Sequence, residues 1–164
     1  MTNLLLGICL IILAITNVNG QTLTKNYVKT TVPTEAVASE QVLSSLRDDD
    51  KRVTLTYFDG LSRPTQVINY RQNPIKRDLV QFSEYDLLGR ESKQYLPYAA
   101  PSADLNFKAN PQSDQANFYL STARVARSYF PYSETVYDNS PLNRVVEQSS
   151  PGEDWQLGNG HTTT

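Results

Sequence analysis

A six-residue pattern that recurs along the chain constrains the fold more than any other feature. FDGLSR (58–63) and YDLLGR (85–90) share an aromatic residue, Asp, any residue, Leu, a small residue and Arg, at identical spacing. YDNSPLNR (137–144) is a third copy with two additional residues before the Leu-x-Arg ending. The pattern is carried by Phe58, Asp59, Leu61, Arg63, Tyr85, Asp86, Leu88, Gly89, Arg90, Tyr137, Asp138, Leu142 and Arg144. Self-similarity of this kind predicts one structural unit used several times.

Each copy predicts a β-hairpin. The position between Leu and Arg is Ser62, Gly89 or Asn143. Gly and Asn are the residues that most readily take a left-handed backbone, so we expect the chain to reverse there. Apolar and polar residues alternate before the first copy, over 53–58, and again after each copy, which is typical of half-buried strands. The unit is therefore strand, turn, strand.

The chain as a whole has nine prolines, seven glycines and ten tyrosines, a composition typical of short strands separated by turns. The sequence predicts a mainly β fold of antiparallel hairpins with loops and one short helix near 113–125, which Ser113 would cap. It also predicts a first strand over 26–32. Residues 34–46 support only a turn or two of helix, with Thr34 or Ser39 as the cap.

A second repeat consists of YLPY (95–98) and YFPY (129–132). Because proline is confined to strand ends and sheet edges, each copy is expected to close a strand and turn its tyrosines onto a neighbouring hairpin. These rings and one tryptophan form a candidate ligand platform for sugars, against the simpler interpretation that they pack between repeats. The platform would consist of Tyr95, Tyr98, Tyr129, Tyr132 and Trp155.

The first twenty residues predict a secretory leader. The apolar run LLLGICLIILAI (4–15) is too short to cross a bilayer, which takes about 20 residues. Val18 and Gly20 are the small residues that a signal peptidase requires, so cleavage is expected before Gln21. We expect export through the Sec pathway to the periplasm, the cell surface or the medium; a retained leader that anchors the chain is the alternative. After cleavage, 21–51 would form an N-terminal strand and linker, and 52–164 the hairpin domain, with no further membrane segment.

Composition excludes several chemistries. The only cysteine, Cys9, lies in the leader, and His161 is the only histidine. The exported chain therefore offers no disulfide, cysteine nucleophile or Ser-His-Asp triad, and neither a cofactor nor a metal site is predicted. A net charge of −2 gives no footprint for nucleic acid. The triple aspartate 48–50 lacks the spacing of a calcium loop and is interpreted as a solvated turn.

The repeated Asp and Arg are expected to act structurally. Asp59 precedes Arg63 by four residues, and Asp86 precedes Arg90 by four. This spacing across a turn suits a hydrogen bond from the backbone to Asp and an ion pair or aromatic stack for Arg. A catalytic acid would need carboxylates that converge from different loops, and no sequence spacing indicates this.

These motifs resemble a known family. The aromatic-Asp-x-x-Gly-Arg unit is similar to the YD repeat of bacterial RHS-repeat proteins. Five motifs resemble, in order, the N-terminal domain that precedes the RHS repeats in secreted Bacteroidota-type proteins: YFDGLSRPTQV, DLVQFSEYDLLGR, KQYLPY, PYSETVYDNSPLNRV, and PGEDW with GNGH. The resemblance covers about 26–161, with Ser62 where the repeat usually has Gly. In the family this stretch runs on into further strands, so we expect a short or truncated member, or an isolated front end.

The resemblance implies an architectural role. RHS and YD repeats wind β-hairpins into a hollow shell that can enclose a C-terminal effector or toxin, and the front domain would begin or plug that shell. We therefore expect a non-catalytic structural or interaction module whose partner is the remainder of such a shell or another protein. A carbohydrate-binding module acting on a surface glycan is the alternative, and a glycan hydrolase that uses carboxylates is the least favoured.

Overall fold

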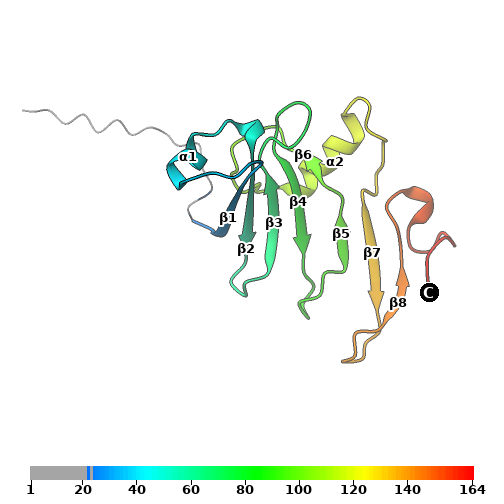
Figure 1. The fold of residues 1–164 in the computed structure, drawn as a ribbon. Coiled ribbons are helices and arrows are strands. Elements are labelled where there is room, and N and C mark those ends of the chain that lie inside the picture. The colour runs from blue at the N-terminus through cyan, green and yellow to red at the C-terminus, as the bar shows by residue number, and fades with distance from the viewer. Residues whose placement is uncertain (1–21, 23) are drawn as a thin grey trace, which may run out of the picture.

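The chain folds around one antiparallel β-sheet of eight strands (Figure 1). The computed structural model describes residue 22 and residues 24–164, so the predicted leader and its cleavage site at Gly20 and Gln21 lie outside the described residues. The strand order is β1-β2-β3-β4-β5-β7-β8, and β6 pairs with β4 beyond the end of β5. The predicted mainly β fold is confirmed.

Three strand pairs are the predicted hairpins: β2–β3, β4–β5 and β7–β8. The strands are β1 (Asn26–Pro33), β2 (Lys51–Phe58), β3 (Pro64–Asn69), β4 (Leu79–Glu84), β5 (Lys93–Tyr95), β6 (Tyr98–Ala99), β7 (Tyr132–Tyr137) and β8 (Val145–Gln148). The predicted first strand is β1, which pairs with β2 along its whole length. It therefore extends the same sheet as the hairpins.

The core lies on one face of the sheet. In β2 the alternation predicted from the sequence places Val53, Leu55 and Tyr57 in the interior. Leu55 stands opposite Ile68, and Ile68 opposite Val80, so these side chains form a buried row across three strands. The segment between β6 and the end of α2 (Pro111–Ser121) packs over this face through apolar side chains at 105, 107, 118 and 119.

The last hairpin lies outside the core. β7 and β8 contain no buried residue, whereas β2 and β4 each contribute at least two to the interior. The sheet therefore has a thick central part over β2–β4 and a thin end at β8 (Figure 1). Only Tyr132 of this hairpin packs against the core, so β7–β8, like the opposite edge strand β1, takes few stabilising apolar contacts from the rest of the sheet.

Two local predictions need correction. The helix expected near 113–125 with Ser113 as its cap is α2, which begins at Pro111 after Asn110 and ends at Ser121. Proline at the first helical position has a suitable fixed φ and needs no amide partner, so the helix starts earlier than predicted. By contrast, Ser39 caps the short helix α1 (Glu40–Ser45), in agreement with one of the two predicted caps.

The second correction concerns the tyrosine-proline motifs. The first copy closes a strand, since β5 ends at Tyr95, but the second copy opens one, since β7 begins at Tyr132. The two copies lie side by side: Tyr95 pairs with Tyr132, and the Leu96 amide donates to the Pro131 carbonyl at 2.9 Å. Antiparallel pairing makes the end of one strand meet the start of the next, which is why the same motif serves both positions.

Candidate functional site

The aspartate of each repeat organises its own turn. Asp59 Oδ1 accepts hydrogen bonds from the backbone amides of Leu61 and Arg63, both at 2.9 Å, and its Oδ2 accepts from Arg63 Nε at 2.8 Å. Asp86 repeats these three bonds with Leu88 and Arg90, at 2.9, 2.9 and 2.7 Å. The predicted Asx-type bond and ion pair are both confirmed, and each carboxylate is committed to the backbone and arginine of its own loop.

The third copy keeps the same arrangement despite its longer turn. Asp138 accepts from the amides of Ser140 and Arg144 and from Arg144 Nε at 2.8 Å. The reversal point predicted from the sequence is also confirmed, because φ is +61° at Ser62, +79° at Gly89 and +50° at Asn143. The six-residue pattern therefore encodes a turn of one defined conformation, which tolerates Ser in place of Gly.

Glycine 89 offers a sharp test of this turn. A Cβ at Gly89 would stand 3.0 Å from Arg63 Nη1, and φ is +79°, so we expect Gly89→Ala to lower the free energy of unfolding by about 1 kcal/mol or more. Gly60 in the first turn is the matched control, since a Cβ there meets nothing within 4 Å. Urea denaturation of both variants measures the difference; equal stabilities would contradict the proposed turn geometry.

Arginine side chains connect each turn to the next. Arg63 Cζ lies 4.3 Å from the centre of the Tyr85 ring, and Tyr85 Oη donates to the Pro64 carbonyl at 2.9 Å. Arg90 Cζ lies 4.7 Å from the centre of the Tyr137 ring. Such a stack is worth about 0.5–1 kcal/mol at an exposed site and more where water is displaced. We call this series of contacts from one turn to the next the Arg–Tyr ladder.

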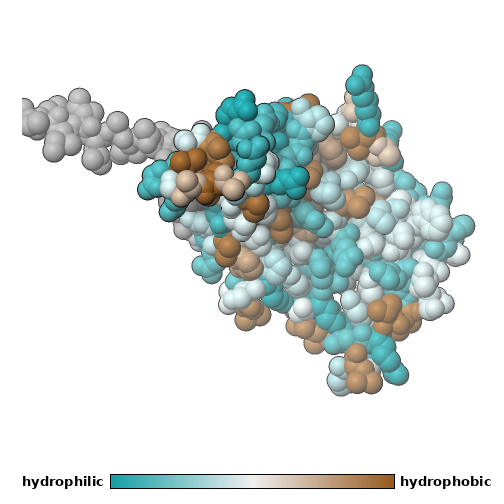
Figure 2. Space-filling view, in the orientation of Figure 1, coloured by the Kyte–Doolittle hydropathy of each residue, from teal (hydrophilic) through white to brown (hydrophobic). Residues whose placement is uncertain are grey.

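The ladder ends at the third turn. The Arg144 side chain is 69% exposed, whereas Arg63 and Arg90 are 31% and 22% exposed. The leucine of the motif is exposed in all three turns, as are Leu87 and Val145 nearby. Figure 2 shows apolar side chains along the lower edge of the molecule, where Figure 1 places the three turns. The motif therefore places its Asp inward and its Leu outward in all three turns, and its Arg inward in the first two.

The turn carboxyls also predict how stability depends on pH. The backbone amides of Arg63 and Arg90 hold the pKa of Asp59 and Asp86 below 3.8, and the Arg144 side chain does the same for Asp138. Unfolding restores the ordinary pKa, so this contribution is complete above about pH 4 and is lost as pH falls through the folded values. We expect urea midpoints to fall on acidification below about pH 4, and to fall less steeply in Asp86→Asn. An identical slope in that variant would contradict this assignment.

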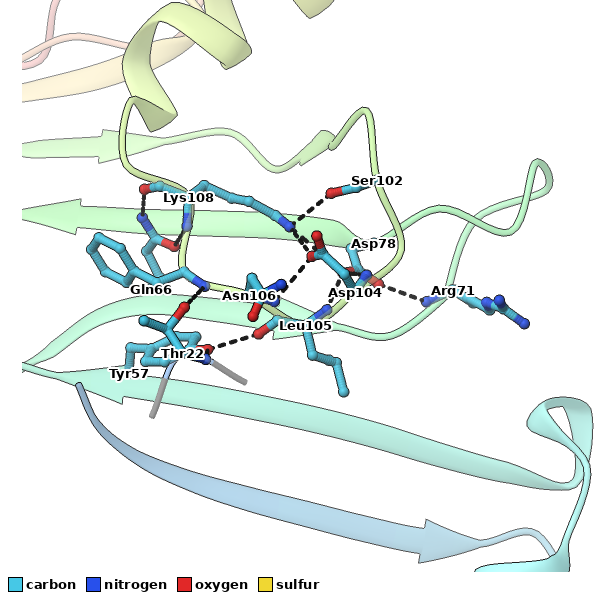
Figure 3. Close-up of polar contacts among 11 residues, drawn as sticks. Thr22, Tyr57, Gln66, Arg71, Asp78, Ser102, Asp104, Leu105, Asn106 and Lys108 are labelled. Carbon is cyan, nitrogen blue, oxygen red and sulfur yellow. Dashed lines mark hydrogen bonds and ion pairs between the residues drawn. The ribbon is translucent and has the colours of Figure 1, made fainter. Parts of the chain in front are cut away.

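A buried polar cluster, which the sequence did not predict, fixes the loop that covers the sheet (Figure 3). Asp78 is fully buried, and its Oδ2 accepts from the amides of Leu105 and Asp104 at 2.8 and 3.0 Å. Lys108, 8% exposed, reaches Asp104 at 2.5 Å and lies 3.9 Å from Asp78. These groups bind one another and the loop backbone, which is the arrangement of a structural clamp.

Two core side chains complete this clamp. Gln66 Nε2 donates to the Lys108 carbonyl at 2.6 Å, and its Oε1 accepts from the Lys108 amide at 2.9 Å. Tyr57 Oη donates to the Leu105 carbonyl at 2.8 Å and accepts from the Thr22 amide at 2.8 Å. Gln66 is a single polar residue in β3, and Asp78 is a single acidic residue before β4. Neither belongs to a repeated or periodic pattern, so the sequence contains no indication of their role.

The five aromatic residues of the predicted platform do not form one surface. Tyr98 is fully buried and Tyr95 nearly so, stacked on Phe82 at 4.1 Å between ring centres, and Tyr132 is half-buried beside Tyr95. This burial removes Tyr95 and Tyr98 from the platform. Tyr129 and Trp155 remain, 60% and 50% exposed. The Tyr129 amide donates to Glu153 at 2.8 Å, so Tyr129 and Trp155 both lie at the 3₁₀ turn Glu153–Trp155.

The triple aspartate does not form a cation site. Asp48–Asp50 is a 3₁₀ turn whose carboxylates pair with Arg71, Lys76 and Arg47, respectively. Within the described part of the chain no group of three or more His, Cys, Asp or Glu could hold a metal ion, and no helix there is long and apolar enough to span a membrane. His161 contacts Trp155 at 5.3 Å between ring centres.

Comparison with known families gives one match. The model of a family described as "Domain of unknown function (DUF6443)" matches residues 29–164, which include all three hairpins. No curated protein and no solved structure matches the chain.

Proposed function

The chain belongs to the DUF6443 family, and we propose that it is a non-catalytic structural module that begins a stack of aromatic-Asp β-hairpins in an exported RHS-type protein. The Arg–Tyr ladder carries this proposal. Arg63 lies over Tyr85 of the second hairpin and Arg90 over Tyr137 of the third, so each hairpin gives its arginine to the one that follows. Interactions that run between successive copies of one unit are typical of repeat stacks.

The chemistry of the turns favours a scaffold over an enzyme. A general acid or nucleophile needs a carboxylate that faces a substrate site. The three motif carboxylates instead accept bonds from their own turn, with their pKa lowered, which keeps them charged and structural. Asp78 and Asp104 are likewise committed to the loop clamp. These five aspartates therefore have structural partners, and none of them faces a substrate site.

The export and RHS parts of the proposal rest on the sequence. A twelve-residue apolar run followed by Val18 and Gly20 supports removal of a leader before Gln21. The five ordered motifs that resemble the front domain of RHS-repeat proteins support a stack of further hairpins as the partner. In an exported scaffold without cysteines, packing between repeats adds to the stability that the core provides, and the ladder supplies such contacts.

Cross-linking in cells that naturally produce the chain tests the proposal. A lysine-reactive cross-linker and mass spectrometry should identify links to polypeptide that carries aromatic-Asp-x-x-Gly-Arg hairpins, in the fraction outside the cytoplasm. The mature chain should begin at Gln21. Retention in the cytoplasm, or links to polypeptide without such hairpins, would overturn the proposal. A Lys93→Arg variant is the control: it keeps the positive charge on β5 but removes one lysine that the cross-linker can react with, so links made through Lys93 should disappear.

The exposed pair Tyr129 and Trp155 favours carbohydrate binding as a second candidate. Two exposed rings near one turn can contact the faces of a sugar. A glycan array decides it: binding by the wild type that is lost in Trp155→Ala and kept in Tyr27→Phe, with unchanged circular dichroism, would support a glycan site. If the wild type binds no glycan on the array, the carbohydrate-binding candidate is rejected and the scaffold proposal remains.

A further inference from the structure

We propose that the outer edge of β8, together with Arg144, is the docking site for the first strand of a further aromatic-Asp hairpin, and that the aromatic residue of this strand stacks on Arg144. This inference rests on the proposed function and deepens it, because it assigns the contact surface, the strand direction and the register. Three observations carry it: the state of Arg144, the open edge of β8 and the register rule of the ladder.

Arg144 forms the ion pair with the aspartate of its own turn, but no tyrosine of the described chain is stacked on its guanidinium. Its Nε binds Asp138 at 2.8 Å, as Arg63 and Arg90 bind their own aspartates. Those two guanidinium groups are covered by the tyrosine of the next hairpin, but no ring of the described residues lies over Arg144, which is 69% exposed. The ion pair with Asp138 holds the guanidinium in place, so a ring can stack on it at a small entropic cost.

The edge of β8 is already paired at one end. The Gln148 amide donates to the Thr163 carbonyl at 2.9 Å, and the Thr163 amide donates back to the Gln148 carbonyl at 3.0 Å. This isolated antiparallel bridge starts a strand on the outer side of β8. The amide and the carbonyl of Gln148 therefore both face the outer side of β8. Val145 and Val146 are 55% and 51% exposed, so the edge is apolar and open toward the turn.

The ladder obeys a register rule. Gln66 pairs with Phe82; Arg63 lies three residues before Gln66, and Tyr85 lies three residues after Phe82. Lys93 pairs with Glu134, and Arg90 and Tyr137 lie three residues before and after them in the same way. Both arginines therefore stand opposite the tyrosine that they stack on, in the register set by the strands.

The same register rule predicts which residue of an added strand would stand opposite Arg144. Gln148 pairs with Thr163, and Arg144 lies four residues before Gln148. A strand that continues the bridge would therefore place its fourth residue after Thr163 opposite Arg144. An aromatic residue at that position would stack on the guanidinium, and the strand would cover Val145 and Val146 on its way there.

A C-terminal extension tests the site directly. A copy of residues 83–95 (SEYDLLGRESKQY) joined after Thr164 places its tyrosine at the fourth position after Thr163. We expect hydrogen exchange of the Gln148 amide, which faces the outer side of β8 in the bridge to Thr163, to slow by roughly tenfold or more relative to the unextended chain. Replacement of the copied tyrosine by Ala, or Arg144→Ala, should each remove a factor of about two to five of this protection.

The controls separate this site from a general effect of the added residues. A single glycine inserted before the copy shifts the register by one and should abolish the gain, because it turns the tyrosine to the opposite face. Arg52→Ala, at an exposed position of β2, should leave the gain unchanged. No slowing at Gln148, equal protection in the shifted extension, or protection that rises with protein concentration would overturn the site, the last by indicating a second copy. Cross-links to hairpin-bearing polypeptide would still support the proposed function in that case.

Discussion

Asp78→Ala is expected to lower the free energy of unfolding by about 3–5 kcal/mol, the range for removal of one partner from a buried ion pair. The carboxylate has no exposed surface, binds the amides of Asp104 and Leu105, and lies 3.9 Å from the buried Lys108 ammonium. Its loss leaves the buried Leu105 amide and the half-buried Asp104 amide without their acceptor, and the loop over the sheet face is no longer fixed. Thermal unfolding followed by circular dichroism should show a midpoint lower by roughly 10 °C or more.

Two variants show whether the cause is the buried acceptor. Asp78→Asn keeps one oxygen that can accept from the amides of Asp104 and Leu105, so its free energy of unfolding should lie between those of the wild type and Asp78→Ala. Asp104→Asn alters a carboxylate that is 32% exposed, and a smaller loss is expected. If Asp104→Asn were as damaging as Asp78→Ala, the role given to Asp78 would be wrong.

Gln66→Leu is expected to have the second largest effect, a loss of about 2–4 kcal/mol. The Gln66 side chain makes two hydrogen bonds to the backbone of Lys108, at 2.6 and 2.9 Å, inside the core between Tyr57 and Phe82. Leucine fills a similar volume but leaves a buried amide and a buried carbonyl without partners, at about 1–3 kcal/mol each when fully desolvated. Urea denaturation monitored by tyrosine fluorescence measures the loss.

Gln81→Leu is the matched control for that substitution. Gln81 lies in the adjacent strand β4 but points to the opposite, exposed face of the sheet, across from Val67. Its replacement should change the free energy of unfolding by about 0.5 kcal/mol or less. Similar losses for both variants would mean that the contacts of Gln66 with Lys108 do not fix the loop.

The sequence predicted the turns well because their interactions are local. In each turn, the aspartate that accepts the hydrogen bonds and the arginine that donates them lie four to six residues apart, and the residue with positive φ lies between them. A six-residue pattern can therefore encode the whole conformation. The same reasoning located β2, because the alternation of Val53, Leu55 and Tyr57 reflects the period of a strand. It did not reveal that the arginine of one turn stacks on the tyrosine of the next.

Only the tertiary structure decided which polar and aromatic residues are buried. Gln66 lies 42 residues from Lys108, and Asp78 lies 27 residues from Leu105, so no local pattern connects them. Tyr98 and Trp155 are both aromatic residues of an apparent platform, yet the covering loop and α2 bury the first and leave the second half exposed. The sequence by itself determined the turns of the hairpins, since each turn is fixed by hydrogen bonds among its own residues. The three-dimensional packing determined the core, the loop clamp and the exposed Arg144, since each depends on what a distant segment covers or leaves open.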